Sequence, residues 1–198
     1  MKIFSKILKY GLVLSLIYCM VFGFSVQAED VSVEEPLVVT TCGQSPGSLI
    51  VQQLAKREGI EVERKDLLKA EYLIDKLDAG EDFKTLFVTI GTSGKGLGAA
   101  GIDMKDEEER INTVIKKAKE QGMIVIGGQI EGKARRVDKA DEKSMKLVAP
   151  QSDILVVHVG ANEDNYYTDL AEEKDIPIYY IENTMETEDV LTELFGIE

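Results

Sequence analysis

The sequence predicts an α/β protein built on one mainly parallel β-sheet of about six strands. Short apolar segments rich in β-branched residues recur along the 198-residue chain, and segments with apolar residues at helical spacing stand between them. Strands that alternate with helices form a parallel sheet that helices cover on both faces. The lack of internal repeats and of low-complexity segments further indicates a single domain.

The first two strands stand on either side of a well-marked helix. Residues 37–41 form an apolar first strand. Ser45 and Pro46 then predict a helix start, with the serine as N-cap and the proline at the first helical position, and Gly59 predicts the end of that helix. Residues 60–63 alternate apolar and acidic side chains, which suits a strand at the edge of a sheet.

The middle of the chain contains two further strands and two helices. A helix over residues 66–77 is expected to pack an apolar face on the sheet. That face contains Leu67, Ala70, Ile74 and Leu77. Residues 83–90 and 123–126 form the third and fourth strands, separated by a helix over residues 106–121 with acids in its first turn and lysines in its last.

The last third of the chain continues this alternation. A helix over residues 139–148, with Asp138 as its N-cap, precedes the fifth strand, residues 154–159. That strand is apolar except for His158, as expected for a buried parallel strand. The sixth strand, residues 176–181, stands between helices over residues 166–173 and 187–195. The whole pattern predicts a Rossmann-like or flavodoxin-like three-layer sandwich.

The amino terminus has the pattern of a secretory signal peptide. Three lysines precede an apolar stretch over residues 11–24, and small residues predict cleavage after Ala28. The stretch is shorter than the ~20 residues that span a bilayer, which favours cleavage over retention as a membrane anchor. We expect a protein exported to the cell envelope or the extracellular space. Its parts are a signal peptide (1–28), an acidic leader (29–36) and one domain (37–198).

Charge and cysteine content exclude several classes of partner. Beyond residue 28 the chain carries 20 basic and 36 acidic residues, a formal net charge of −16. Such a surface repels nucleic acids and anionic lipids, so we expect neither as a partner. No transmembrane segment is expected after signal cleavage. Cys42 would then be the single cysteine, which excludes a disulfide within the chain.

The segment 86–101 is the strongest indication of a binding site. An apolar strand leads directly into a loop, residues 91–105, whose first part is rich in glycine. Ligands of α/β proteins bind at the carboxyl ends of the strands, and glycine lets backbone N–H groups approach an anion. The candidate ligand-binding residues of this loop are Thr92, Ser93, Gly94, Lys95 and Gly96. The glycine spacing fits neither a Walker A motif nor a dinucleotide fingerprint.

The loop after the first strand, residues 41–48, adds a thiol and a helix amino terminus. Gln44, Ser45 and Ser48 are candidate ligand contacts there, because a helix amino terminus attracts anions. The electric field of the same helix amino terminus would lower the pKa of Cys42 and so activate its thiol as the nucleophile of a phosphatase-like or thiol-transfer enzyme, with His158 as a base. A cysteine phosphatase would need arginine in place of Ser48. The similar phosphocysteine loop of sugar phosphotransferase B components needs a cytosolic phosphoryl donor. A packed, unreactive Cys42 is the competing interpretation.

Two further loops complete the expected binding edge. Residues 127–138 contain the densest basic cluster of the chain, and its Arg135 and Arg136 suit carboxylate or phosphate recognition. Asn162 follows His158 in the loop 160–165. The alternative for His158 is a histidine that is hydrogen-bonded in the core. The alternative for the basic cluster is a run of charges exposed to solvent. No spacing of His, Cys and carboxylates indicates a metal site, and no catalytic triad is recognisable. The sequence identifies neither a cofactor nor an oligomeric state.

Three segments together resemble a known family. CGQSPG (42–47), GKGLGAAGID (94–103) and ARR (134–136) are similar to segments of exported bacterial α/β proteins classed only as a domain of unknown function. The resemblance covers roughly the whole chain beyond the signal peptide and implies related strand-end loops, but no activity. The chain departs from the family pattern at Gln129, usually histidine, at Val137, usually glycine, and within the loop 160–165.

These observations predict an exported single-domain protein that binds a small anionic or polar ligand where its strands end. Two alternatives stay open. One is a cysteine-dependent enzyme that uses Cys42, and the other is a protein-interaction module with no small ligand.

Overall fold

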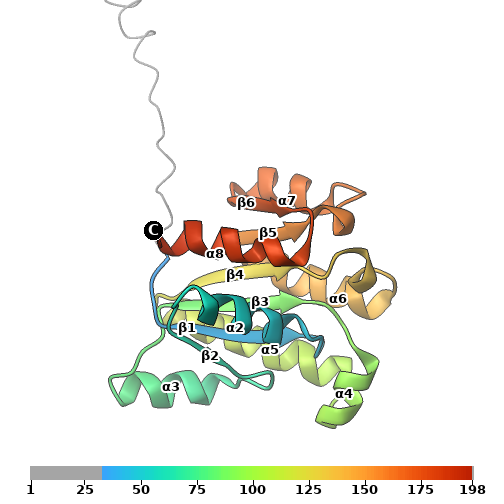
Figure 1. Cartoon of the computed structure of the whole chain (residues 1–198). Coiled ribbons are helices and arrows are strands. Elements are labelled where there is room, and N and C mark those ends of the chain that lie inside the picture. The colour runs from blue at the N-terminus through green and yellow to red at the C-terminus, as the bar shows by residue number, and fades with distance from the viewer. Residues whose placement is uncertain (1–32, 198) are drawn as a thin grey trace, which may run out of the picture. The chain divides into compact units, whose positions relative to one another are not determined.

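The computed structural model describes residues 33–197, which form a six-stranded sheet with helices on both faces (Figure 1). The strands are β1 (Leu37–Cys42), β2 (Val62–Arg64), β3 (Thr85–Ile90), β4 (Ile124–Gln129), β5 (Ile154–His158) and β6 (Ile178–Ile181). Their spatial order is β2-β1-β3-β4-β5-β6, and every neighbouring pair is parallel. The predicted α/β fold is confirmed. The signal peptide predicted over residues 1–28 lies outside the described residues.

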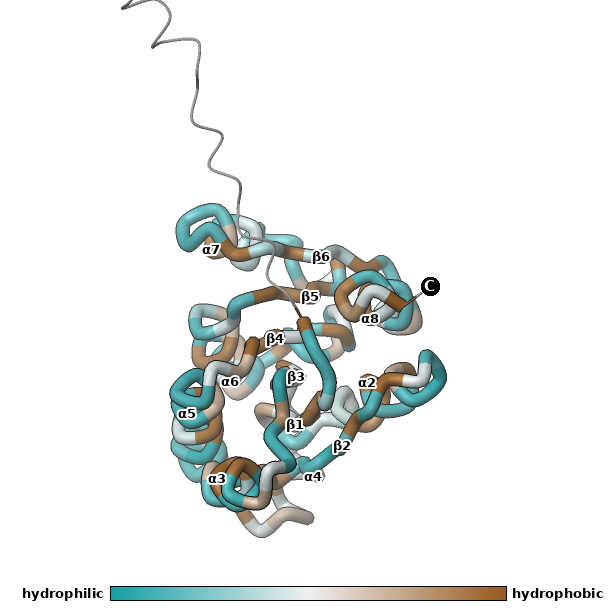
Figure 2. Tube along the Cα trace, turned by 90° about the vertical axis from the view of Figure 1, so that its left-hand side faces the viewer, coloured by the Kyte–Doolittle hydropathy of each residue, from teal (hydrophilic) through white to brown (hydrophobic). Residues whose placement is uncertain are grey.

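Within residues 33–197 the helices form two layers. They are α2 (Gly47–Arg57), α3 (Ala70–Asp78), α4 (Gly94–Ala100), α5 (Met104–Glu120), α6 (Lys139–Val148), α7 (Tyr166–Lys174) and α8 (Thr187–Phe195). Figure 2 shows α2 and α8 on one face of the sheet and α3, α5, α6 and α7 on the other. Short 3₁₀ turns follow β4, α6, β5 and β6.

Each face of the sheet has its own apolar core, because successive strand residues point to opposite faces. In β3, Phe87 packs with Val51 and Leu54 of α2, whereas Val88 packs with Ile111 and other residues of α5. Gly128 of β4 makes room for the Phe87 ring, because a Cβ on this glycine would lie 2.2 Å from a ring carbon. Burial of both faces explains the continuous apolar runs seen in the sequence.

The order of the strands creates a switch point between β1 and β3. The chain leaves β1 towards β2 on one side and continues from β3 towards β4 on the other. This is the order of flavodoxin-like sheets, extended by a sixth strand, and such sheets bind ligands where the two connections diverge. The residues at this point are the loops after β1 and after β3.

Several predicted boundaries differ from the structure, by up to three residues at the ends of strands. Residues 94–100, expected as loop, form the helix α4, and α5 begins at Met104 with a capping box on Asp103. The fourth strand continues to Gln129, three residues beyond the predicted end. Ser45 does not cap α2; the N-cap is Pro46, and its helix start has no side-chain hydrogen bond. The predicted cap of α6 by Asp138 is confirmed.

The predicted apolar face of α3 is also wrong. Ala70 is buried as expected, but Leu67, Ile74 and Leu77 are exposed. Leu73 and Leu68 occupy the core instead. The helix is shorter than predicted and begins at Ala70, so its orientation is set by the docking of Leu73 against the sheet rather than by the widest apolar stripe. No helix among the described residues has the length and apolar character needed to cross a membrane.

Candidate functional site

The two loops of the switch point are joined to each other by backbone hydrogen bonds. Ser93 N donates to Gly43 O over 2.7 Å, and Gly91 N donates to Cys42 O over 3.2 Å. Gln44 and Thr92 form an isolated antiparallel bridge. Gly43 has a φ of +107°, and a Cβ there would lie 2.5 Å from Gly91 O, so only glycine permits this approach. The loops form one rim rather than two independent segments.

A buried ion pair of α5 supports this rim from below. The Glu107 carboxylate is fully buried and accepts hydrogen bonds from Gly43 N at 2.8 Å and Gln44 Nε2 at 3.0 Å. Arg110 donates to the same carboxylate through Nε and Nη2, and its Nη2 also donates to Thr41 O over 2.7 Å. The charge pair therefore fixes the loop after β1 to α5. Sequence analysis missed both residues because they lie in a regular run of helical charges.

Two of the predicted contacts in the loop after β1 have structural partners. The Gln44 side chain donates to Asp66 O as well as to Glu107, and these bonds stabilise its positive φ of 59°. Ser48 donates to the Asp66 carboxylate over 2.6 Å. Both side chains therefore hold the loop after β1 to the segment before α3.

The glycine-rich segment after β3 is a short helix, which corrects the expectation of a pocket-forming loop. Ser93 caps α4 by accepting from Gly96 N over 3.1 Å. Gly96 packs directly on the first loop, because its Cβ would lie 2.1 Å from Gln44 O. Gly94 and Lys95 are exposed, and Lys95 makes no ion pair with any described residue. Gly96 therefore serves the close packing of the two loops, whereas a Cβ on Gly94 or Gly98 would meet nothing within 4 Å.

Thr92 joins the rim to β4 and α6. Its N–H donates to the Asp141 carboxylate over 2.9 Å, and its carbonyl accepts from Arg135 Nη1 over 3.1 Å. The Arg135 side chain also lies against Gly91, with Cγ 3.0 Å from the place of a Cβ. The structure therefore brings the predicted residues Thr92 and Arg135 together at the switch point.

The expected basic cluster is neutralised by carboxylates. Arg135 donates to Glu131 through Nε, Lys133 pairs with Glu163, and Arg136 pairs with Asp164. Arg136 also lies near the rings of Tyr166 and Tyr167. The sequence did not reveal this neutralisation, because the acidic partners lie in another loop, as Glu163 and Asp164 do, or four residues earlier, as Glu131 does.

The loop after β5 lies beside a small hollow, of about 270 Å³, near Lys133 and Arg136. The side chain of Asn162 makes hydrogen bonds within the protein there: it accepts from Tyr167 N and donates to Thr168 Oγ1. His158 is half-buried, and its Nδ1 accepts from Gly160 N over 3.0 Å. Neither residue contacts the rim of the switch point.

Cys42 lies in the core beneath the rim and is fully buried. Burial, reinforced by the charge of Glu107, raises the pKa of the thiol far above its usual value. A thiol without access or thiolate character is a poor nucleophile. This environment disfavours the cysteine-dependent enzyme and agrees with a packed residue.

Three polar atoms near the switch point make no hydrogen bond with the described residues, although they are buried. They are Thr41 Oγ1, Ser45 Oγ and Glu131 Oε1. Glu131 Oε1 lies 3.0 Å from the place of a Cβ on Gly47, in the first turn of α2. Buried polar groups nearly always have partners, so these atoms are the candidates for contact with a ligand or with water. Sequence analysis missed Thr41 and Glu131, which carry no motif.

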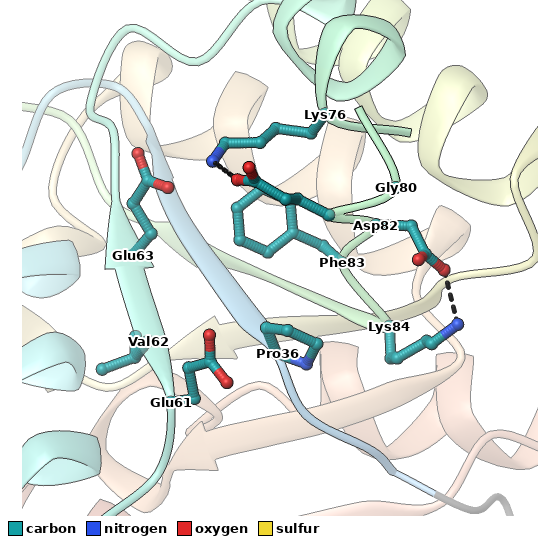
Figure 3. A pocket seen from close by; sticks show the side chains of 10 residues that line it. Pro36, Glu61, Val62, Glu63, Lys76, Gly80, Asp82, Phe83 and Lys84 are labelled. Carbon is teal, nitrogen blue, oxygen red and sulfur yellow. Dashed lines mark hydrogen bonds and ion pairs between the residues drawn. The ribbon is translucent and has the colours of Figure 1, made fainter. Parts of the chain in front are cut away.

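A larger hollow, of about 650 Å³, lies at the opposite edge of the sheet, where the strands begin (Figure 3). Both lysines that line it are paired: Lys84 with Asp82, and Lys76 with Glu81. Glu63 accepts from Tyr72 over 2.7 Å. No buried polar atom without a partner lines this hollow, and we therefore place the candidate site at the switch point. The described residues contain no cluster of metal ligands.

The fold and this rim define a doubly wound α/β protein with a flavodoxin-like strand order. The chain matches the family described as "Domain of unknown function (DUF6305)" over residues 34–195, and it belongs to that family. This confirms the resemblance to a family without an assigned activity. No curated protein matches the chain.

Several solved structures share the general arrangement of the fold at low identity. A de novo designed Rossmann 2x3 fold protein is 14% identical with a TM-score of 0.37, covering 83% of this chain and 95% of the other. A putative lipolytic protein of the G-D-S-L family from Desulfitobacterium hafniense is 15% identical, TM-score 0.35, covering 74% and 77%. The REC domain of RcsB from Salmonella enterica serovar Typhimurium is 14% identical, TM-score 0.34, covering 80% and 97%. Likeness at this level carries no inference about chemistry.

Proposed function

We propose that this protein is exported and binds a small polar or anionic ligand at the switch point between β1 and β3. The observation that carries the proposal is the group of buried polar atoms without partners on Thr41, Ser45 and Glu131. A group that is taken out of water without a hydrogen bond costs stability, and a ligand that supplies the bond recovers it. The rigid rim keeps these atoms in place before binding, which lowers the entropic cost of association.

A thermal-shift screen against sugars, dicarboxylates, phosphates and nucleotides tests the binding. At 100 times Kd a ligand stabilises the folded state by about 2.7 kcal/mol. For a domain of this size, that corresponds to roughly 5–10 °C in Tm. We expect the shift to be lost in Arg135→Ala and reduced in Lys95→Ala, whereas Lys116→Ala, an exposed lysine of α5, leaves it intact. A ligand whose shift survives both replacements would refute this site.

Export is tested separately by producing the full chain in a bacterial host and measuring the mass of the recovered protein by mass spectrometry. Cleavage after Ala28 predicts a chain that begins at Glu29 and is recovered outside the cytoplasm. An intact amino terminus in the membrane fraction would instead identify an anchor.

A protein-interaction module is the second candidate, favoured by one observation. Four large apolar side chains are exposed in the first turn of α2 or in the loops after β4, β5 and β6. They are Leu49, Val137, Val159 and Met185. Exposed apolar side chains grouped at one edge are typical of binding surfaces. This candidate predicts no response to any small molecule in the same screen.

A further inference from the structure

The switch-point site contains a carboxylate, and this narrows the ligand class. Glu131 Oε2 accepts from Arg135 Nε over 3.1 Å, whereas Glu131 Oε1 is buried and has no donor. Gly47 makes the position possible, because a side chain there would approach Oε1 to 3.0 Å and Thr89 Cβ to 3.1 Å. An ionised carboxylate only accepts hydrogen bonds, so whatever completes the site at Oε1 has to donate one.

Two of the four buried hydroxyls that have no partner among the described residues, those of Thr41 and Ser45, lie at the same switch point. Thr41 is the neighbour of Thr89 across the β1–β3 pair, and Thr89 Oγ1 lies 3.3 Å from the place of the Gly47 Cβ. Ser45 Oγ lies 3.2 Å from the place of a Cβ on Gly91, beside the Arg135 side chain. Ser45 is 4% exposed and Thr41 is fully buried. Each hydroxyl offers one donor and two acceptor positions.

The charge balance favours a neutral ligand over an anionic one. Arg135 is already compensated by Glu131, and the neighbouring Lys133 and Arg136 are compensated by Glu163 and Asp164. A phosphate or carboxylate ligand would meet the Glu131 charge without an unpaired arginine to offset it. A ligand hydroxyl, in contrast, donates to Glu131 Oε1 and accepts from a serine or threonine hydroxyl at the same time.

We infer that the ligand of the switch-point site is a neutral polyol, such as a sugar, whose hydroxyl donates a hydrogen bond to Glu131. The inference rests on the proposed function and specifies its ligand class. Arg135 covers Gly91 and Ser45 and is partly exposed, so a ligand that reaches Ser45 contacts this arginine. Arg135 then serves as a second donor to the ligand.

Isothermal titration of the purified protein with glucose, ribose, myo-inositol, succinate and inorganic phosphate tests the inference. We expect at least one of the three polyols to bind. Glu131→Gln keeps the size of the side chain but removes its charge, and we expect this to weaken polyol binding at least about tenfold. The matched control is Glu61→Gln, in the hollow at the opposite edge, which leaves binding unchanged. Unfolding curves of both variants confirm that they fold.

The other outcomes separate the two proposals. Binding of phosphate or succinate that tightens in Glu131→Gln overturns the polyol inference and leaves the proposed site intact. Polyol binding that is lost in Glu61→Gln but not in Glu131→Gln moves the site to the other edge and overturns both. No binding by any of the five compounds also overturns both, since an internal water then satisfies Glu131.

Discussion

The buried pair of Glu107 and Arg110 gives the sharpest test of how the candidate site is held. Glu107→Gln keeps the shape of the side chain but leaves the guanidinium of Arg110, whose side chain is 10% exposed, without its counter-charge. Removing one partner of a buried pair costs about 3–5 kcal/mol. Four hydrogen bonds end on this carboxylate, two of them from the loop after β1, so the loss also loosens the rim.

Urea unfolding followed by circular dichroism measures this cost as a free energy, and thermal unfolding measures it as a change in Tm. In a domain of this size we expect Tm to fall by roughly 6–20 °C, at about 2–4 °C per kcal/mol. Glu109→Gln is the matched control, because Glu109 is exposed on the same helix, and it should stay within about 0.5 kcal/mol of the wild type. Replacing both partners, as Glu107→Leu with Arg110→Met, should regain only part of the loss, because Gly43 N and Gln44 Nε2 still lack their acceptor. A cost below about 1 kcal/mol for Glu107→Gln would refute the role given to the pair.

Three further predictions concern the same rim and its supports. The pKa of Cys42 is higher in the folded state than in the unfolded state. The buried thiol therefore contributes its full stability below the unfolded-state pKa of about 8.5, and this contribution is lost progressively as the pH rises above that value. The wild type should therefore lose more stability than Cys42→Ala between about pH 8 and about pH 10 in urea titrations. Iodoacetamide should label Cys42 slowly in the native protein and rapidly in urea; fast native labelling would revive the cysteine enzyme. Gly96→Ala should cost about 1–3 kcal/mol, because its Cβ meets Gln44 O, whereas Gly98→Ala, with open space around it, should gain about 0.5–1 kcal/mol; equal effects would contradict the packing of α4. Asp138→Ala should cost about 1 kcal/mol in chemical unfolding, since this cap accepts from two amides of α6, and no loss would exclude that role.

The strands were the most predictable part of the fold. Four of the six predicted strands coincide closely with β1, β3, β5 and β6, whereas the predicted second strand, 60–63, overlaps β2 only at residues 62–63. The central strands were recognisable because a buried parallel strand has to be apolar on both faces. The helix α4 was missed because glycine is a poor helix former, and its segment is helical only where it packs on the loop after β1. The face of α3 was misjudged because periodicity alone does not say which side of a short helix meets the sheet.

The candidate site was predictable in its place and not in its chemistry. The carboxyl ends of the strands follow from the alternation of strands and helices, and Ser45, Thr92 and Arg135 lie at the switch point. Gln44, Ser48 and Asn162, which were predicted to contact a ligand, make hydrogen bonds to other residues of the protein. Their hydrogen-bonding capacity is visible in the sequence, whereas the partner that uses it is not.

The sequence by itself determined the fold class, the approximate strands and helices, and the edge at which the loops gather, because these depend on local periodicity and on the chirality of parallel connections. Only the tertiary structure decided the strand order, the burial of Cys42 and the pairing of each arginine. It also brought Glu131 to the first turn of α2, 84 positions away along the chain from Gly47. Charge compensation and burial depend on contacts between distant segments, and no local pattern records them.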